Sequence, residues 1–540
     1  MPLALLRCSI WVPMRSSLIL RAVTTSWVAV LANAAVGLLL TPYVLHHIGD
    51  EAFGLWVLVV TLVGYYGVLD GGVRSSILRY TSRYRALGDQ ESVKEVVATA
   101  FYYYLGACAL VILVTYLSVG LTSRFFAVHS QVLGAFKSLF LLAGVVQGLS
   151  LPLAVFSASL EAAGRYDQVY VIRVASLAVR VVAVIAVVRA GGGLFGVGAA
   201  VLLSQLLSYI VQVPLAMRAN QGLSLRPKWV RKSAFQSMLR YGSISLTVCI
   251  AEKLRSSIYP VVIAKFLTPV AVTFFSLPVR ILSLPTEGIG TMTEIVNPVS
   301  SELEARNDFA KLRELILLSV QSAFLLLAPM AAFLFIFGRE LLTLWVGTTY
   351  ASTYSLLVLL TLGMGTAATQ CCLQSMLFGI EKHKQLIWYR MGEGLSIALL
   401  GSAALRIAGL EGFAVVITLT LLLTSLILVP RHLCHIVGLP LRTYLTEGCL
   451  KPCIAALPGA AAFMALRGLL VVDTWPTLFF ALFVGSLVYI LTLFVMLCGP
   501  PALFGWFVPG ILHVFEQRFL RPRGFRLGAA TETVYSGESQ

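Results

Sequence analysis

Residues 168–188 read QVYVIRVASLAVRVVAVIAVV, an apolar run that is long enough to cross a lipid bilayer. Because backbone groups in lipid must hydrogen-bond within the chain, we expect this run to form a membrane-spanning α-helix. It nevertheless contains two arginines, Arg173 and Arg180, and a charge placed in mid-bilayer costs roughly 3 kcal/mol on insertion scales. Such residues usually face a bundle interior or a hydrated cavity, so both are candidates for a functional role.

The whole chain shares this apolar character. Of its 540 residues, 58% are apolar and 12% are charged, whereas soluble domains have about half and about a quarter. This composition excludes a soluble enzyme, a disordered chain and a secreted disulfide scaffold. The nine cysteines lie mostly in apolar runs and lack the spacing of zinc ligands, so we interpret them as free thiols and expect no metal.

The apolar segments predict about fourteen membrane-spanning helices. A transmembrane β-barrel would instead show segments of about ten residues with alternating polarity, and the sequence has no such segments. The predicted spans are 18–45, 53–80, 96–120, 135–160, 168–188, 194–216, 241–264, 270–298, 315–337, 352–378, 386–406, 410–430, 449–467 and 476–498.

The basic residues between these spans predict the topology. About 26 lie on the side of the N-terminus and about seven on the opposite side, with Arg390 counted in a segment of the N-terminal side. Since positive charge marks the cytoplasmic side, we expect both termini in the cytoplasm. The net charge of +16 is then a topology signal, and we expect no nucleic acid partner.

An internal repeat indicates how the spans are organised. A shift of 219 residues aligns Arg21 with Arg240, and a shift of 216 residues aligns residues 193–196 with 409–412. Each copy holds six spans, so the repeat is parallel, and such folds place substrate between the two halves. We therefore predict an all-α polytopic membrane protein with two six-helix lobes and two further C-terminal helices. The predicted parts are an N-terminus (1–17), an N-lobe (18–216), a basic linker that is either an amphipathic surface helix or simply solvated (217–240), a C-lobe (241–432), two extra helices (433–500) and a basic to polar tail (501–540).

Seven basic residues fall inside the predicted spans, namely Arg21, Arg74, Arg173, Arg180, Lys253, Arg255 and Arg280. Arg180, Arg255 and Arg280 are the deepest, and we favour a functional role for these three. The guanidinium group matches the geometry of phosphate oxygens, so the excess of basic charge favours a substrate that carries phosphate. Arg21 and Arg173 lie near helix ends and are equally compatible with snorkelling to the interface.

Acidic residues accompany several of these charges. Asp70 and Arg74 are four residues apart and Glu252 and Arg255 are three apart, both spacings at which helical side chains pair. Simple mutual neutralisation is therefore the alternative to a functional role for these pairs. In the eighth span, Arg280, Glu287 and Glu294 recur at intervals of seven residues and form a stripe on one helix face.

Three short motifs resemble a known family. Residues 48–56 (IGDEAFGLW) resemble the loop after the first span of polysaccharide (Wzx-type) flippases, which belong to the multidrug/oligosaccharidyl-lipid/polysaccharide exporter (MOP) superfamily. Residues 68–73 (VLDGGV) resemble the end of their second span, and residues 164–166 (GRY) resemble the turn before their fifth. The second half departs from this pattern, because Thr268 and Pro269 replace the Gly-Asp of the first half.

The resemblance implies a V-shaped transporter of the bacterial inner membrane, not an enzyme, with two lobes that alternate between inward-open and outward-open states. Its substrate would be an undecaprenyl-pyrophosphate-linked oligosaccharide, flipped from the cytoplasmic to the periplasmic leaflet for surface polysaccharide biosynthesis. The two extra helices resemble those of the lipid II flippase, in which a lipid-facing groove takes the prenyl tail. Membrane lipids and other polysaccharide-assembly membrane proteins would be its partners.

The resemblance also implies roles for the charged residues. Basic residues of the cavity would hold the pyrophosphate, and acidic residues would gate the lobes or bind a coupling cation, H+ or Na+, with no other cofactor, no metal and no catalytic residue. The basic candidates are Arg180, Arg255, Arg280, Arg173, Lys253 and Arg74, and the acidic candidates are Asp70, Glu252 and Glu287.

Two other functions remain open at this point. A cation-coupled multidrug exporter of the same superfamily would have about twelve spans and a more acidic cavity. A membrane glycan polymerase or glycosyltransferase would need a substantial extramembrane loop or domain, and the outer loops here, such as 121–134 and 338–351, are short.

Overall fold

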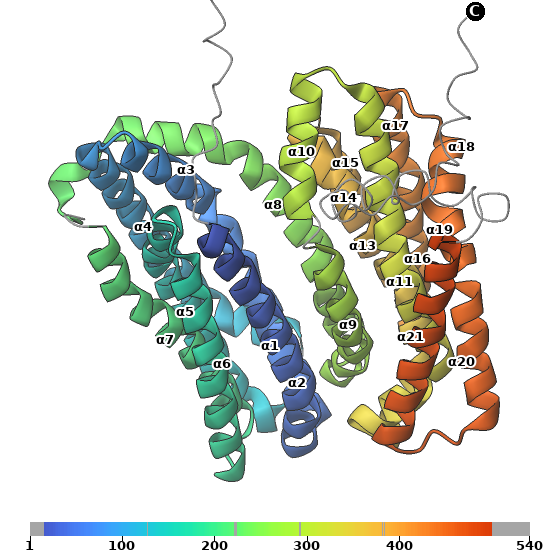
Figure 1. Ribbon diagram of the computed structural model, residues 1–540. Helices are drawn as coiled ribbons and strands as arrows, with labels where there is room; N and C mark the ends of the chain where they lie inside the picture. Colours follow the sequence, from blue (N-terminus) through green and yellow to red (C-terminus); the bar gives the residue numbers. More distant parts are fainter. Residues whose placement is uncertain are drawn as a thin grey trace, which may run out of the picture. The chain divides into compact units, whose positions relative to one another are not determined.

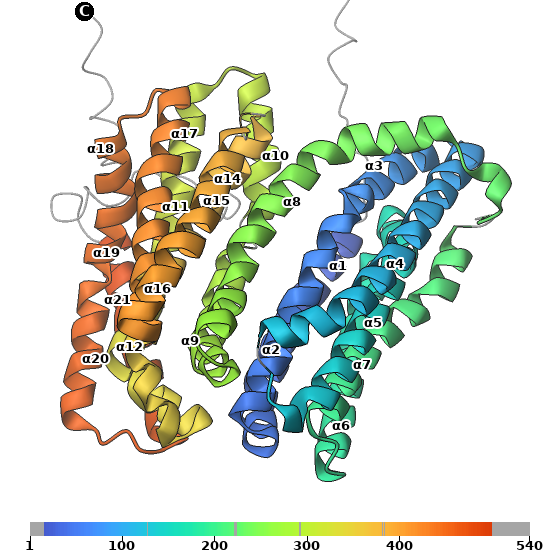
Figure 2. The same ribbon diagram turned by 180° about the vertical axis from the view of Figure 1, so that it is seen from behind.

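The computed structural model describes residues 16–126, 128–220, 224–290, 293–380, 382 and 384–498 (Figures 1 and 2). All regular elements within these ranges are helical, and none of the described residues forms a strand. The prediction of an all-α protein is confirmed. Most of the predicted N-terminus and all of the tail from residue 501 lie outside the described residues.

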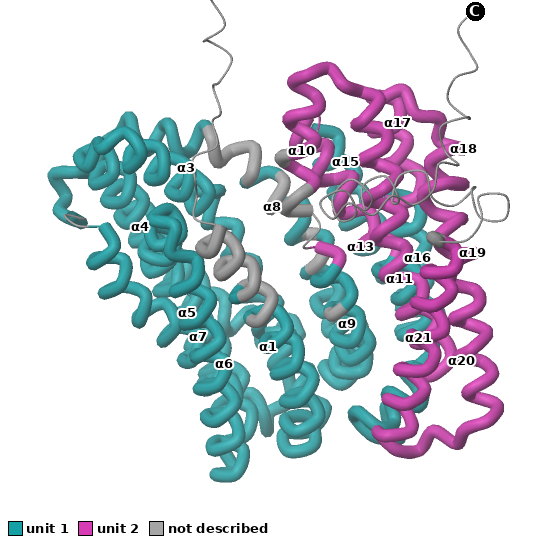
Figure 3. The backbone as a smooth tube through the Cα atoms, in the orientation of Figure 1, with its two compact units in different colours: residues 1–288, 338–365, 383–424 teal, residues 289–337, 366–382, 425–540 magenta. Residues whose placement is uncertain are grey.

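The chain packs into two compact units (Figure 3). The described residues of the first unit fall within 1–288, 338–365 and 383–424, and those of the second fall within 289–337, 366–382 and 425–540. The chain therefore passes between the units several times, and α11 (Phe309–Val346) begins in the second unit and ends in the first.

The first unit contains α1 (Ser16–Ile48), α2 (Asp50–Gly64), α3 (Val73–Ala86), α4 (Gln90–Phe125), α5 (Ser130–Ala162), α6 (Tyr166–Arg189), α7 (Gly193–Ala219), α8 (Lys232–Phe266), α9 (Pro269–Gly290), α12 (Tyr354–Leu360), α15 (Lys384–Ser396) and α16 (Ser402–Leu422). The second contains α10 (Thr293–Ala305), α13 (Thr366–Thr369), α14 (Cys371–Gly379), α17 (Val429–Val437), α18 (Leu441–Thr443), α19 (Lys451–Ala455), α20 (Leu457–Leu469) and α21 (Trp475–Cys498). Short 3-10 and π-helical turns connect several of them, including a 3-10 turn at Tyr65–Asp70.

The lengths of these helices match a multi-pass membrane protein. Eleven helical stretches of the described chain are long and apolar enough to cross a membrane. One of them, Lys384–Val437, has 54 residues and breaks at Gly409, whose φ of 60° is left-handed, so it is long enough for two crossings, each of which needs about 20 residues. α8 covers the predicted span 241–264 and α9 covers the predicted span 270–298 in part, but both contain charges or prolines, and neither is among the eleven stretches.

The second predicted span, 53–80, is not one helix. α2 ends at Gly64, a 3-10 turn follows, and α3 begins at Val73. Gly71 and Gly72 have φ values of 58° and 71°, a left-handed conformation that glycine adopts without a Cβ clash. The two glycines thus change the direction of the chain in the middle of an apolar run.

The start of α4 follows ordinary capping chemistry. α4 begins after Asp89, whose carboxylate accepts hydrogen bonds from the backbone N–H of Ser92 at 3.0 Å and from its hydroxyl at 2.6 Å. These hydrogen bonds favour the ionised carboxylate and lower the pKa of Asp89. The cap fixes the turn between α3 and α4.

Close backbone contact joins α2 to the start of α9 within the first unit. A Cβ on Gly54 would lie 1.8 Å from the carbonyl oxygen of Pro269, so only glycine fits there. Thr273 donates a hydrogen bond of 2.6 Å to the backbone carbonyl of Asp50 at the same place. The end of α1 and the start of α2 therefore lie beside the start of α9.

We expect the substitution Gly54→Ala to destabilise the protein by about 1–3 kcal/mol, the usual cost of overpacking, because a backbone carbonyl yields less than a flexible side chain. Gly106→Ala in α4 is the matched control, since no atom lies within 4 Å of a Cβ at that position. Thermal unfolding in detergent checks the prediction. Equal unfolding temperatures for the two variants would contradict the close contact between α2 and α9.

Candidate functional site

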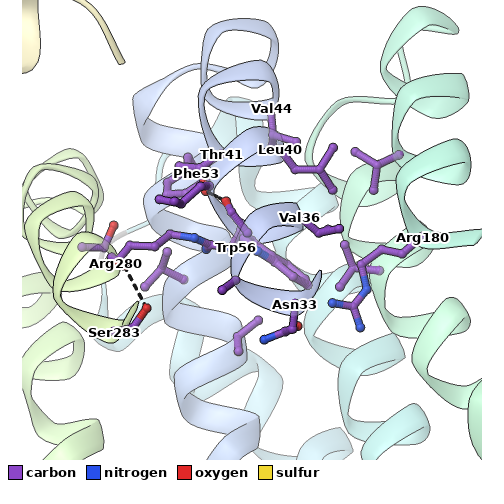
Figure 4. A pocket seen from close by; sticks show the side chains of 18 of the residues that line it. Asn33, Val36, Leu40, Thr41, Val44, Phe53, Trp56, Arg180, Arg280 and Ser283 are labelled. Carbon is purple, nitrogen blue, oxygen red and sulfur yellow. Dashed lines mark hydrogen bonds between the residues drawn. The ribbon is translucent and has the colours of Figure 1, made fainter. Parts of the chain in front are cut away.

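The first unit contains a pocket of about 470 Å³ (Figure 4). Side chains of α1, α2, α6, α7 and α9 line it, and most of its walls are apolar. A largely apolar cavity of this size with a few polar groups is typical of a ligand site. The polar and charged residues that line it are Asn33, Thr41, Thr61, Arg180, Ser276, Arg280, Ser283 and Glu287.

Arg280 reaches across from α9 to α1. Its guanidinium lies so close to Gly37 that a Cβ on that glycine would be 3.1 Å from the Nη2 atom. The absence of a side chain at Gly37 therefore makes room for the guanidinium. Among the described residues, no carboxylate forms an ion pair with Arg280.

Arg180 enters the same pocket from α6, and Figure 4 shows the two arginines on opposite sides of the view. Its Nε atom is buried and has no hydrogen-bond partner among the described residues. Two like charges in an apolar cavity repel each other more strongly than they would in water. The pocket is therefore suited electrostatically to an anion that binds both guanidinium groups.

The hydroxyl groups of the pocket are already engaged. Each donates a hydrogen bond to a carbonyl oxygen of its own helix, as Ser and Thr often do inside helices. The donor–acceptor distances are 2.6 Å for Thr41, 2.8 Å for Thr61, 2.9 Å for Ser276 and 2.8 Å for Ser283. These hydroxyls contribute little to ligand binding in this conformation, and the charged and amide groups remain.

Arg255 lies in a different environment from Arg180 and Arg280. It belongs to a charge network formed by Glu252 and Arg255 of α8 with Arg390 and Glu393 of α15. The predicted pairing of Glu252 with Arg255 is confirmed, and Arg255 Nε also lies 3.6 Å from Glu393. Arg390 lies 2.7 Å from Glu393 and 3.4 Å from Glu252. Two positive and two negative charges thus neutralise each other, so Arg255 is engaged by protein carboxylates.

The burial of Arg390 corrects the position that was assigned to it from the sequence. Arg390 was assigned from the sequence to a segment between spans, but it lies inside α15 and only 8% of its surface is exposed. The side chain of Glu393 is 1% exposed and also accepts a hydrogen bond from Thr424. Arg390 and Glu393 are three residues apart, the spacing that identified Glu252 and Arg255, so the same signal could have found them.

The predicted pair of Asp70 and Arg74 does not form. The left-handed glycines between the two residues interrupt the helix, so the four-residue spacing no longer places them on one face. Asp70 instead accepts a hydrogen bond from Tyr104, and Arg74 forms an ion pair of 2.6 Å with Glu161. Arg173 lies 3.8 Å from the same Glu161, so Arg74 and Arg173 share one carboxylate away from the pocket.

The remaining candidates are separated. Lys253 lies opposite Gly64 of α2, where a Cβ would be 3.8 Å from its Nζ atom. Glu287 lines the pocket together with Arg280, as expected for two residues on the same face of α9. The side chains of Arg21 and Glu294 lie outside the described residues. The roles assigned to the acidic residues in coupling or gating stay predictions.

Comparison with known proteins identifies a matching protein family and a related sequence. A family model described as "Polysaccharide biosynthesis protein" matches residues 48–355, which is more than half of the chain. The "Uncharacterized membrane protein EpsK" of Bacillus subtilis (strain 168) is 22% identical over 483 residues, covering 87% of this chain and 94% of EpsK.

Two solved structures share the fold. The lipid II flippase MurJ in an inward closed conformation has a TM-score of 0.68 at 14% identity and covers 88% of this chain and 99% of its own. An inward-facing multidrug resistance MATE family transporter of the MOP superfamily also has a TM-score of 0.68 at 14% identity, and covers 78% of this chain and 99% of its own. The helices described here therefore adopt the fold of MOP superfamily membrane transporters.

Proposed function

Because this chain belongs to the polysaccharide biosynthesis protein family, we propose that it flips an undecaprenyl-pyrophosphate-linked oligosaccharide across a bacterial inner membrane. The chain is a multi-pass membrane protein with the fold of membrane transporters. In this proposal it makes and breaks no covalent bond, both of its termini are cytoplasmic, and the headgroup moves from the cytoplasmic to the periplasmic leaflet by alternating access.

The observation that carries the proposal is the pair of guanidinium groups in the pocket. Neither Arg180, which is partly buried, nor Arg280, which is exposed, forms an ion pair with a described carboxylate, so both guanidinium groups are available to a ligand. A diphosphate would bind both groups through charge-assisted hydrogen bonds, for which the planar guanidinium is well shaped.

The arginines that form ion pairs with carboxylates have a structural role in this proposal. Arg255 and Arg390 hold α8 to α15 through Glu252 and Glu393, and Arg74 and Arg173 are linked through Glu161. We assign these groups to the scaffold and only Arg180 and Arg280 to the headgroup. In this proposal the arginines that pair with carboxylates stabilise the fold, and the two unpaired arginines of the pocket bind the substrate.

A multidrug exporter is the second candidate, favoured by the MATE-like fold and by the apolar walls of the pocket. Two observations weigh against it. Two unpaired arginines repel organic cations, and the MATE structure covers 78% of this chain, whereas MurJ covers 88%. The additional coverage supports the lipid-linked substrate.

Deletion of the gene in its bacterial host tests the proposal. We expect lipid-linked oligosaccharide to accumulate with its headgroup on the cytoplasmic side and surface polysaccharide to disappear, with both effects reversed by the intact gene. Chromatography of extracted lipids coupled to mass spectrometry measures the accumulation. Normal polysaccharide with a new sensitivity to toxic compounds would instead support the exporter.

A further inference from the structure

We propose that a cleft between α3, α4 and the first turns of α8 binds the headgroup of an anionic phospholipid whose phosphate carries glycerol, as in phosphatidylglycerol. The cleft lies in the first unit, and none of its lining residues lines the pocket of Arg180 and Arg280. The inference therefore concerns a lipid of the surrounding membrane and does not depend on the transported substrate. Three observations support it, namely how α8 packs, what lines the cleft and which charges surround it.

The first observation concerns the packing of α8. Its first turns lie along α3 and α4 (Figures 1 and 2). The backbone N–H of Arg231 donates a hydrogen bond of 3.1 Å to the Thr99 hydroxyl, and the Ser76 hydroxyl donates one of 3.1 Å to the carbonyl oxygen of Met238. The side chain of Met238 is buried among apolar residues of α3 and α4. This part of the predicted basic linker is therefore fixed against two other helices, and the cleft between the three has defined walls.

The second observation concerns the lining of the cleft, which has a volume of about 150 Å³. Six of its eight lining residues have polar side chains, namely Tyr80, Tyr84, Ser92, Glu95, Ser233 and Ser237. The hydroxyls of Tyr84, Ser233 and Ser237 form no hydrogen bond with any described residue. Since polar groups in folded proteins normally have partners, a small ligand with several hydroxyls would satisfy these three.

The third observation concerns the charges around the cleft. Residues 79–95 and 224–240 contain nine basic and three acidic residues. Glu95, which lines the cleft, is paired with Arg231 at 3.0 Å. The surroundings therefore favour an anion, while the cleft itself offers mainly neutral hydrogen-bonding groups.

Two exposed cations flank the cleft. Arg83 lies three residues after Tyr80 on the surface of α3, and Lys232 directly precedes Ser233 of α8. Neither Arg83 nor Lys232 forms an ion pair with a described carboxylate. Each basic residue near an anionic membrane surface contributes about 1 kcal/mol of attraction. A phosphate can therefore bind these two side chains while the glycerol attached to it enters the cleft.

Aromatic and apolar side chains favour a lipid over a soluble anion. The Nζ atoms of Lys94 and Lys228 each lie 5.2 Å from the centroid of the Trp229 ring, just before α8. Tryptophan is enriched at membrane–water interfaces, where lysine extends its ammonium group to the headgroups. Val230 and Leu239, which precede and follow the cleft residues of α8, are exposed large apolar side chains. A membrane lipid would cover these apolar groups, whereas a soluble anion would leave them in water.

Titration of the purified full-length protein with lipid, followed by native mass spectrometry, tests the inference. The probes are dioleoylphosphatidylglycerol, dioleoylphosphatidylmethanol, which has the same charge but a methyl group in place of the headgroup glycerol, and glycerophosphoglycerol, which has no acyl chains. We expect phosphatidylglycerol to bind about fivefold more tightly than phosphatidylmethanol, as one hydrogen bond of about 1 kcal/mol would provide. Glycerophosphoglycerol is expected to bind at least tenfold more weakly than phosphatidylglycerol.

The double variant Ser233→Ala/Ser237→Ala removes two hydroxyls of the cleft and keeps every charge. It is expected to bring the ratio of the two lipid affinities close to one. Its affinity for phosphatidylmethanol should equal that of the wild type, which also shows that the variant is folded.

The double variant Arg83→Gln/Lys232→Gln is expected to weaken the binding of both lipids by about tenfold or more, because it removes both cations that flank the cleft. Arg165→Gln/Arg218→Gln is the matched control. It removes two exposed basic residues that precede α6 and end α7, so the net charge changes equally while the cleft is untouched. Its lipid affinities should equal those of the wild type.

Equal affinity of the wild type for phosphatidylglycerol and phosphatidylmethanol would overturn the glycerol site. An equal loss of binding in the two charge variants would also overturn it, since the attraction would then be a property of the whole basic surface. Binding of glycerophosphoglycerol as tight as that of phosphatidylglycerol would overturn the lipid as ligand in favour of a soluble one. The proposed function is tested separately, by the accumulation of lipid-linked oligosaccharide, and none of these results contradicts it.

Discussion

Replacing Arg180 and Arg280 together by glutamine is expected to abolish surface polysaccharide and to leave the amount of protein in the membrane unchanged. Each guanidinium would contribute charge-assisted hydrogen bonds worth about 1.5–3 kcal/mol to headgroup binding, so the double variant loses affinity by a factor of about 100 or more. Stability is spared because neither arginine pairs with a described carboxylate, and no buried anion is left behind.

Arg189→Gln is the matched control for this prediction, because Arg189 is exposed at the end of the same helix as Arg180. Polysaccharide staining measures function, and immunoblotting of membranes measures abundance. The double Arg→Lys variant keeps the charge but loses the planar fork, so it should retain intermediate function. Normal polysaccharide in the double glutamine variant would remove both arginines from the mechanism.

Replacing Glu393 by alanine is expected to destabilise the protein by about 3–5 kcal/mol, the cost of breaking a buried ion pair from one side. The substitution leaves Arg255 and Arg390 in buried surroundings with only Glu252 to neutralise them, and it removes the acceptor of the Thr424 hydroxyl. Thermal unfolding in detergent and the yield of folded protein measure the effect.

Glu302→Ala is the control for this second prediction, since it removes an exposed pair with Arg306 that is worth at most about 1 kcal/mol. The double substitution of Arg390 and Glu393 by methionine should recover part of the lost stability, because replacing both partners by apolar groups removes the uncompensated charge. A Glu393→Ala variant that is fully stable but inactive would place Arg255 and its network in the transport pathway.

The spans and the arginine pair could be predicted because each depends on a single stretch of sequence. Arg180 and Arg280 stand out as charges within apolar runs, and the cost of such charges is a property of the residue and its helix. The stripe of Arg280 and Glu287 likewise follows from helical periodicity alone. Local periodicity therefore located two sides of the pocket, α6 and α9.

The neutralisation of Arg255 could not be predicted from the sequence, because Glu393 lies far along the chain and the contact depends on how α8 packs against α15. Asn33 and Trp56, which also line the pocket, were not predicted, since neither has a charge that marks it within a helix. The break at Gly71 and Gly72 did have a local signal, the glycine doublet, which outweighs the four-residue spacing of Asp70 and Arg74.

The most direct test of the arginine pair is the affinity of purified full-length protein in nanodiscs for undecaprenyl diphosphate, compared with that of the Arg180→Gln/Arg280→Gln variant. The account predicts measurable binding by the wild type and a loss of about 100-fold or more in the variant, with undecaprenol, which lacks the diphosphate, bound weakly and equally by both. Equal affinity of the two proteins for undecaprenyl diphosphate would contradict it.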